Sequence, residues 1–224
     1  MLRRSLKILV YVVASFVVLS VALVLPMRWY APNMTMFMFV DDSDEFRYEW
    51  VDWDDIGTNL ALAVVAAEDQ RFADHFGVDT TAIQKALDEQ DERGSLRGAS
   101  TITQQTVKNL YLWSGRSFVR KGLEAWFAVV AEVCLPKRRI LEIYLNIAEL
   151  GPGIYGVGAA SRHYFGKEPA SLGDSEAALL AAVLPSPRRY RVINPTPFVR
   201  ERRDWILSQM RRLEREGWIT RIDR

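Results

Sequence analysis

The chain has 224 residues, of which 49% are apolar and 25% charged, values that exclude the disordered and collagen-like classes. Its 29 Lys and Arg against 28 Asp and Glu give a formal net charge of +1, without the strongly basic character of a nucleic-acid-binding domain. A single cysteine, Cys134, excludes an intramolecular disulfide framework and a cysteine-rich metal site. We therefore expect a globular protein that binds no nucleic acid and has no dedicated metal site.

The first predicted element is a transmembrane helix. The eighteen residues from Ile8 to Leu25 carry no charge, and about 20 apolar residues span a bilayer core. Arg3, Arg4 and Lys7 precede this run and no acid occurs among the first forty residues, so the positive-inside rule predicts a cytoplasmic N-terminus. A cleaved signal peptide is the less favoured alternative, because its apolar region is usually only about 7 to 15 residues long.

We expect three parts: residues 1–30 as cytoplasmic tip and transmembrane anchor, 31–55 as juxtamembrane segment and linker, and 56–224 as one catalytic domain. Within the second part, Met34 to Val40 forms a Met and Phe stripe, for which core packing is favoured over lipid contact. Asp41 to Asp55 then carries eight acids against one basic residue, and we interpret it as a solvated linker.

The catalytic domain is predicted to be all-α. Apolar residues recur at helical spacing from Ile56 and again from Ile140, and the apolar run from Ala177 to Val183 indicates a buried helix. Thr196 before Pro197 marks the start of a last helix, whereas alternating strand patterns are scarce.

The first candidate site begins at Glu68, which follows four apolar residues at the end of a predicted helix. Partial desolvation raises the proton affinity of a carboxylate, as a general base near neutral pH requires. Glu68 is therefore the candidate catalytic base. An equally compatible interpretation is a helix-end carboxylate held by Arg71 or His75. We expect Asp69 and His75 to orient the Glu68 loop.

The second candidate site is a helix start. Thr101, with Gln104 three residues later, matches a capping box, and a helix N-terminus attracts anions. Gln104 and Lys108 share one helix face, and Gln105 and Asn109 form the adjoining row. Uncharged donors around one lysine suit sugar hydroxyls and phosphate oxygens. The alternative, a solvated helix face, explains poorly why these polar residues are not simply Glu and Lys.

A third segment combines cations with a carboxylate. Arg116, Arg120 and Lys121 precede Glu124, and such cations suit a leaving pyrophosphate. The alternative is a surface pair of Arg120 with Glu124, worth only about 0.3 to 0.5 kcal/mol. A fourth segment begins at Lys137, and we expect most of it to pack in the core.

Four segments resemble, in order, the main signatures of the glycosyltransferase family 51 peptidoglycan polymerases: EDQRFADHFG from Glu68, GASTITQQTVKN from Gly98, RKGLE from Arg120 and KRRILEIYLN from Lys137. The similarity continues to Tyr190. Because no penicillin-binding transpeptidase domain follows, the chain resembles the monofunctional biosynthetic peptidoglycan transglycosylases, which implies no transpeptidase activity.

The resemblance implies a lysozyme-like helical fold and polymerisation of lipid II into β-1,4 glycan strands, with inversion at the donor carbon and release of undecaprenyl pyrophosphate. Glu68 would remove the proton from the acceptor 4-hydroxyl. Glu124 would be the second catalytic carboxylate, orienting a basic side chain or a divalent ion. No cofactor is implied as required, although Mg or Mn is compatible with the family. The implied substrate-binding residues are Asp69, Ser100, Thr101, Gln104, Gln105, Lys108, Asn109, Arg116, Arg120 and Lys121.

The implied partners are lipid II, the growing glycan strand and the membrane, with other cell-wall synthesis and division proteins as further candidates. The implied location is the bacterial cytoplasmic (inner) membrane, crossed once, with the catalytic domain on the periplasmic side. We also expect the acidic, glycine-containing stretch from Asp88 to Gly98 to act as a mobile flap between donor and acceptor sites.

Two other functions compete with this one. A lysozyme-like hydrolase or lytic transglycosylase would use Glu68 as a protonated acid, and it would need neither Lys108 nor the cations from Arg116 to Lys121. A membrane-anchored scaffold for other wall enzymes would tolerate the loss of Glu68 and Glu124.

Overall fold

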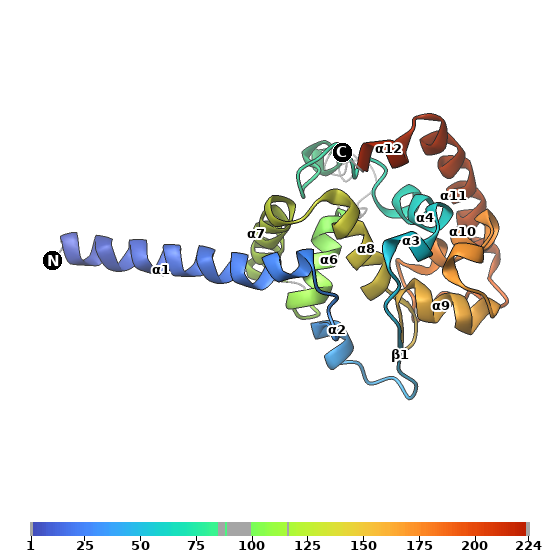
Figure 1. Ribbon diagram of the computed structural model, residues 1–224, viewed down its shortest axis with the longest axis horizontal. Coiled ribbons are helices and arrows are strands. Elements are labelled where there is room, and N and C mark those ends of the chain that lie inside the picture. Colours follow the sequence, from blue (N-terminus) through green and yellow to red (C-terminus); the bar gives the residue numbers. More distant parts are fainter. Residues whose placement is uncertain (1, 85–87, 89–99, 116, 223–224) are drawn as a thin grey trace.

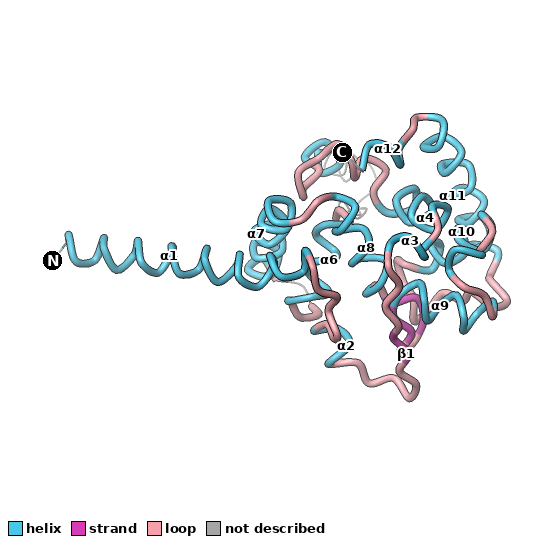
Figure 2. The backbone as a smooth tube through the Cα atoms, in the orientation of Figure 1, coloured by secondary structure: helices cyan, strands magenta, loops and turns pink. Residues whose placement is uncertain are grey.

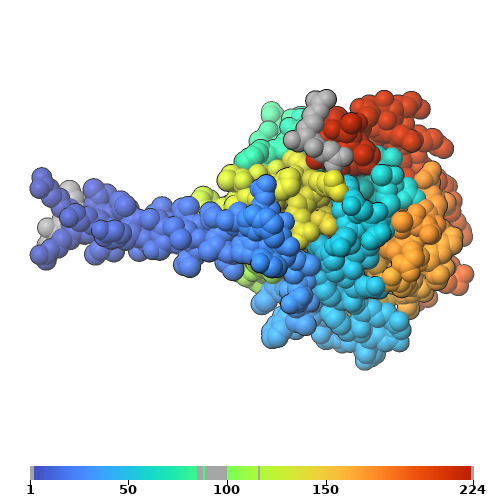
Figure 3. All heavy atoms as spheres, viewed as in Figure 1, coloured from blue at the N-terminus to red at the C-terminus, as the bar shows by residue number. Residues whose placement is uncertain are grey.

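The computed structural model describes residues 2–84, 88, 100–115 and 117–222. A long helix, α1 (Leu2–Val24), projects from a rounded helical domain, and the 3-10 helix η1 (Leu25–Arg28) follows it (Figure 1). Most of α1 stands clear of the domain in the space-filling view (Figure 3). Among the described residues, Arg3–Arg28 is the one helical stretch long and apolar enough to cross a membrane.

Helices dominate the rest of the described chain (Figure 2), which confirms the prediction of an all-α domain. Residues 80–84 are helical, and η2 (Pro169–Ser171) is a second 3-10 turn. The remaining helices are α2 (Met36–Phe39), α3 (Trp53–Ile56), α4 (Thr58–Glu68), α6 (Ile102–Tyr111), α7 (Phe118–Cys134), α8 (Lys137–Ile147), α9 (Gly156–Phe165), α10 (Asp174–Val183), α11 (Pro197–Arg215) and α12 (Trp218–Ile222).

The core forms where α4 packs against α10 and α11, and where α6 packs against α7 and α8. Every residue of α4 from Leu60 to Ala66 is buried, because neighbouring helices cover more than one side of it. In α10 all residues from Ala177 to Val183 except Leu179 are buried, which confirms the predicted buried helix. The end of α4, where Glu68 lies, is thus held by a rigid, fully packed helix.

A small sheet is the element that the sequence pattern missed. Strand β3 (Ile154–Tyr155) pairs in parallel with β1 (Arg47–Tyr48) and antiparallel with β2 (Glu149–Gly151). Strands of two or three residues are too short to produce a recognisable alternation of apolar and polar residues. Gly153 joins β2 to β3 with φ of 68°, and a Cβ there would collide with the carbonyl oxygen of Glu45.

The segment from Asp41 to Asp55 packs along the domain, whereas we expected a solvated linker. Besides forming β1, it is held by Asn146 of α8, whose side chain accepts a hydrogen bond from the Val51 amide at 2.7 Å. The same side chain donates to the Val51 carbonyl at 2.8 Å. Because Asn146 lies 95 residues after Val51, the local composition could not reveal this contact.

Replacing Asn146 with alanine is expected to lower the free energy of unfolding by about 2 to 4 kcal/mol, because it leaves both backbone groups of Val51 unpaired at a buried position. Thermal and denaturant unfolding of the detergent-solubilised protein measures this change. The matched control is the exposed Asn33→Ala. Equal stability losses for the two variants would contradict the role of Asn146.

The acids of this segment also have fixed partners. The side chain of Asp41 is only 2% exposed, and it pairs with Arg188 at 2.8 Å and accepts a hydrogen bond from the Tyr155 hydroxyl. Burial raises the pKa of Asp41, but hydrogen bonds from Ser43 and Tyr155, together with the Arg188 charge, outweigh it and lower the pKa. The acidic stretch is therefore part of the domain surface rather than a free tether.

The Met and Phe stripe from Met34 to Val40 lies mostly outside the core, so the favoured prediction of core packing is wrong for most of it. Met38 is buried beside Thr35, whose hydroxyl accepts a hydrogen bond from the Met38 amide at 3.2 Å. The exposed side chains are those of Met34, Met36, Phe39 and Val40.

The C-terminal part of α1 packs against α7. The Phe16 and Trp126 rings lie 5.4 Å apart, and the indole of Trp126 donates a hydrogen bond to the Ser20 hydroxyl at 3.0 Å. Further along, Arg28 donates to the carbonyl of Cys134 at 3.2 Å. The apolar helix is thus docked on the catalytic domain and is not joined to it by a loose connection.

Candidate active site

Glu68 is the last residue of α4, and its side chain is 13% exposed. Its Oε2 accepts a hydrogen bond from the Gln105 amide at 2.9 Å, and its Oε1 lies 3.3 Å from Nη2 of Arg202. The Tyr144 hydroxyl donates to Oε1 of Gln105 at 3.0 Å, which orients the amide so that its NH₂ faces Glu68. The carboxylate is therefore held from α6 on one side and from α11 on the other.

Burial raises the pKa of Glu68, whereas the Gln105 hydrogen bond and the charges of Arg202 and Lys108 lower it. The net direction is upward, as a general base near neutral pH requires. Neither Arg71 nor His75 is the partner of Glu68, so the alternative interpretation of a carboxylate held by these residues is wrong. Arg71 pairs with Asp79 at 3.1 Å.

Asp69 ties the end of α4 to the start of α6. One oxygen of its buried carboxylate lies 2.9 Å from Nε2 of His75, and the same oxygen accepts a hydrogen bond from the Ile102 amide at 3.0 Å. A carboxylate at a helix N-terminus is also favoured by the helix dipole. Asp69 and His75 thus lie where they can orient the Glu68 loop.

Two predicted substrate-binding residues form the capping box of α6. The Thr101 hydroxyl accepts from the Gln104 amide at 3.2 Å, and the Gln104 side chain accepts from the Thr101 amide at 3.1 Å. Both residues are buried. Their side chains organise the start of α6, while Gln105, Lys108 and Asn109 on the same helix remain partly exposed.

Lys108 lies between the two candidate catalytic carboxylates. Burial lowers its pKa, while the charges of Glu124 and Glu68 raise it. Its ammonium also lies 5.4 Å from the centre of the Phe37 ring in α2. The net direction of the Lys108 pKa is downward, and in its charged form this half-buried side chain can bind an anion that enters the site.

Glu124 of α7 is buried, with only 3% of its side chain exposed. One oxygen accepts from Arg120 at 2.6 Å, and the other accepts from Lys121 at 2.5 Å. Lys121 also donates to the Ser100 hydroxyl at 3.1 Å. The alternative of a surface pair is therefore wrong, since the carboxylate is buried and organises two cations.

Two cavities meet at Glu68. The larger has a volume of about 820 Å³ and is also lined by Ser100, Gln105, Arg202 and Trp205. The smaller, of about 230 Å³, shares Glu68 and Ser100 with it and continues past Asp69 and Thr101. A carboxylate at such a junction can face two bound units at once.

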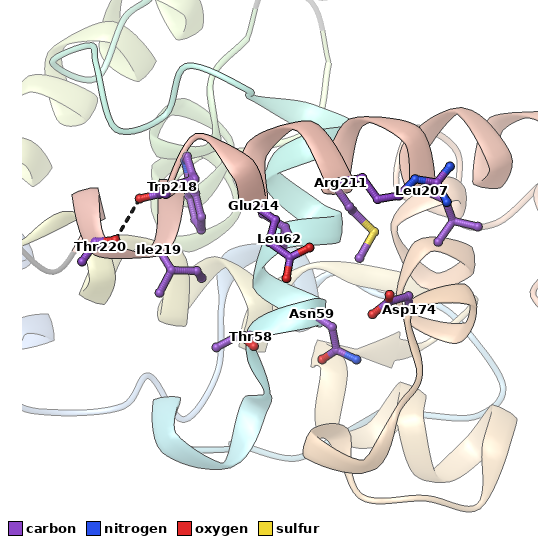
Figure 4. A pocket seen from close by; sticks show the side chains of 12 residues that line it. Thr58, Asn59, Leu62, Asp174, Leu207, Arg211, Glu214, Trp218, Ile219 and Thr220 are labelled. Atoms are coloured by element: carbon purple, nitrogen blue, oxygen red, sulfur yellow. Dashed lines mark hydrogen bonds between the residues drawn. The ribbon is translucent and has the colours of Figure 1, made fainter.

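A separate cavity of about 340 Å³ lies where the start of α4 meets α10, α11 and α12 (Figure 4). Its walls include Asn59, Asp174, Arg211 and Glu214. It contains none of the residues predicted to take part in the reaction.

Several predicted features are not part of the described chain. The structure does not describe Arg116, nor the expected flap from Asp88 to Gly98 apart from Asp88 itself. Within residues 2–84, 88, 100–115 and 117–222, no group of three or more His, Cys, Asp or Glu side chains could hold a metal ion.

Arg202 and Tyr144 belong to the site although no sequence pattern predicted them. Arg202 reaches Glu68 from 134 residues further along the chain, on a helix with several other arginines. Tyr144 lies in a segment that we expected mainly to pack. Neither position carries a local signal that separates it from its neighbours.

Comparison with known proteins agrees with this geometry. The transglycosylase family model matches residues 35–211. Relatives named biosynthetic peptidoglycan transglycosylase occur in Shewanella amazonensis (52% identical, covering 94% of this chain and 87% of the relative) and Pseudomonas aeruginosa (45% identical, covering 99% and 97%). A third, from Xylella fastidiosa, is 50% identical and covers 90% and 86%. The chain therefore belongs to the transglycosylase family, as a peptidoglycan transglycosylase.

Proposed function

We propose that this chain polymerises lipid II. The 4-hydroxyl of the acceptor sugar attacks the anomeric carbon of the donor, Glu68 takes the hydroxyl proton, and undecaprenyl pyrophosphate leaves with the electron pair of the broken bond. Attack from the face opposite the leaving group inverts the donor carbon and produces a β-1,4 linkage. The observation that carries the proposal is the Glu68 carboxylate at the junction of two cavities, beside a group of cations.

Glu68 must be ionised to accept the proton. Burial increases its affinity for a proton, and the Gln105 hydrogen bond with the Arg202 charge limits this effect. A carboxylate balanced in this way accepts a proton more readily than an exposed one, while the cationic surroundings favour its charged form.

The leaving pyrophosphate needs positive charge. Arg120 and Lys121 lie close to Lys108, because the charge of each lowers the pKa of Lys108. Glu124 holds Arg120 and Lys121 in place, and we assign it this orienting role rather than proton transfer. Arg116 is proposed to join the same group. A hydrolase would not require this concentration of cations.

The docking of α1 on α7 supports a membrane-bound substrate. Phe16 lies nine residues before Leu25, or about 13.5 Å below the outer end of the apolar run at 1.5 Å per residue. Trp126 contacts Phe16, and Cys134 contacts Arg28 just beyond that end. The exposed Val129 and Val133, between these two points of α7, then lie beside the outer half of the apolar run.

We therefore propose a single-pass protein of the inner membrane, with a cytoplasmic N-terminus and a periplasmic catalytic domain. A domain held at this depth can reach a sugar whose lipid tail stays in the bilayer. Met36 and Phe39 of α2 are also exposed, and we assign them to the membrane-facing surface.

Incubation of the purified, detergent-solubilised protein with labelled lipid II tests the proposal. We expect glycan polymer that is resolved by size and that lysozyme digests, as β-1,4 strands should be. Fragments released from preformed glycan, without polymer from lipid II, would instead indicate a hydrolase. Inactivity in both assays would favour a scaffold.

A further inference from the structure

We propose that Arg202 of α11 is a positioning residue that keeps the Glu68 carboxylate ionised and aimed into the cleft during the reaction. The inference rests on the proposed function, because it concerns the base of that reaction. It assigns a role in proton transfer to α11, which lies outside the four sequence segments with candidate chemistry.

The contact geometry leaves Glu68 able to react. Nη2 of Arg202 lies 3.3 Å from Oε1 of Glu68 and 3.4 Å from the carbonyl of Ala67. Charge-assisted hydrogen bonds between such groups are usually about 2.7 to 2.9 Å long. The longer contact supplies positive charge without saturating Oε1. Gln105 donates to the other oxygen at 2.9 Å, so each oxygen accepts one hydrogen bond and keeps a lone pair that can take the proton.

Arg202 is also placed at a cost to stability. Its side chain is 24% exposed, and its buried Nε has no hydrogen-bond partner within the described part of the chain. Burying a guanidinium donor without a partner is unfavourable. The same side chain lines the cleft of about 820 Å³ in front of Glu68, where a bound sugar could meet it.

Among the charged groups around Glu68, Arg202 is the cation that is not neutralised during the proposed reaction. From α6 come Gln105 and Lys108, and the adjacent Asp69 contributes a negative charge. Tyr144 of α8 acts through Gln105, and Glu201 of α11 lines the same cleft. In the proposed reaction the donor pyrophosphate neutralises Lys108. Arg202 then remains as the positive charge beside the base.

The experiment compares the pH dependence of the initial polymerisation rate, from about pH 5 to 9, for the parent, Arg202→Met and Arg202→Lys. Without the guanidinium, Glu68 holds its proton up to a higher pH. We expect the acid limb of Arg202→Met to move upward by at least about 0.5 pH unit. Arg202→Lys, which restores the charge, should stay close to the parent. The matched control is Arg203→Met, on the next residue, which is 26% exposed and pairs with Asp204.

A lower rate at every pH with an unmoved acid limb, or an equal shift in Arg203→Met, would overturn the assignment. Circular dichroism and thermal unfolding check that each variant is folded. If Arg202→Met does not fold, Arg202→Gln replaces it under the same criterion. A parent that makes no polymer at any pH would contradict the proposed function itself, and this result is obtained before any variant is compared.

Discussion

Glu68→Gln is expected to lower kcat for lipid II polymerisation by a factor of about 10² to 10⁴, the usual contribution of a positioned general base. The amide has nearly the same shape as the carboxylate, so α4 and its neighbours should keep their packing. It cannot accept the hydroxyl proton, however. Initial rates with labelled lipid II measure the loss, and Glu216→Gln, an exposed acid paired with Arg212, is the control.

The pH profile gives this prediction a second test. Protonated Glu68 is inactive, so the parent rate should fall as the pH drops through the Glu68 pKa, which burial places above the ordinary value of 4.5. The residual rate of Glu68→Gln should lack this acid limb. A variant that keeps most of the parent rate, or the same acid limb, would show that another group is the base.

Glu124→Gln is expected to lower kcat/KM by about 100-fold, the scale of a lost electrostatic contact to a developing charge. The amide leaves Arg120 and Lys121 without the buried carboxylate that both contact. The cations then repel one another and no longer converge on the pyrophosphate. The acid limb should stay where the parent has it, because Glu68 remains the base.

The control for this variant is Glu168→Gln, which removes an exposed acid paired with Arg162. Thermal unfolding shows whether each variant is folded at the assay temperature. A normal kcat/KM in folded Glu124→Gln would contradict the orienting role. Disappearance of the acid limb would instead assign the proton transfer to Glu124.

The sequence by itself determined the features whose causes are local. The long apolar run predicted α1, and helical spacing predicted the helical domain. The capping box at Thr101 formed as expected, because its two hydrogen bonds join residues three apart. Glu68 stood out because it follows an apolar helix, whereas the burial of its carboxylate also requires α6 and α11, which contact it through Gln105 and Arg202.

Local patterns were less reliable where a side chain had two possible uses. Gln104 matched both a capping residue and a sugar-binding residue, and the buried capping box uses its amide oxygen. The acids from Asp41 to Asp55 have the composition of a solvated linker, yet Asp41 is buried against Arg188. Composition describes what a segment can do in water, whereas its partners decide what it does in the fold.

Only the tertiary structure decided which charges meet at the site. Arg202 lies 134 residues from Glu68, and Asn146 lies 95 residues from Val51. Helix periodicity and capping depend on residues within about four positions of one another, so short stretches of sequence are enough to predict them. Contacts between helices depend on how whole faces pack, and that packing brings Arg202 of α11, rather than the nearby Arg71, to the carboxylate of Glu68.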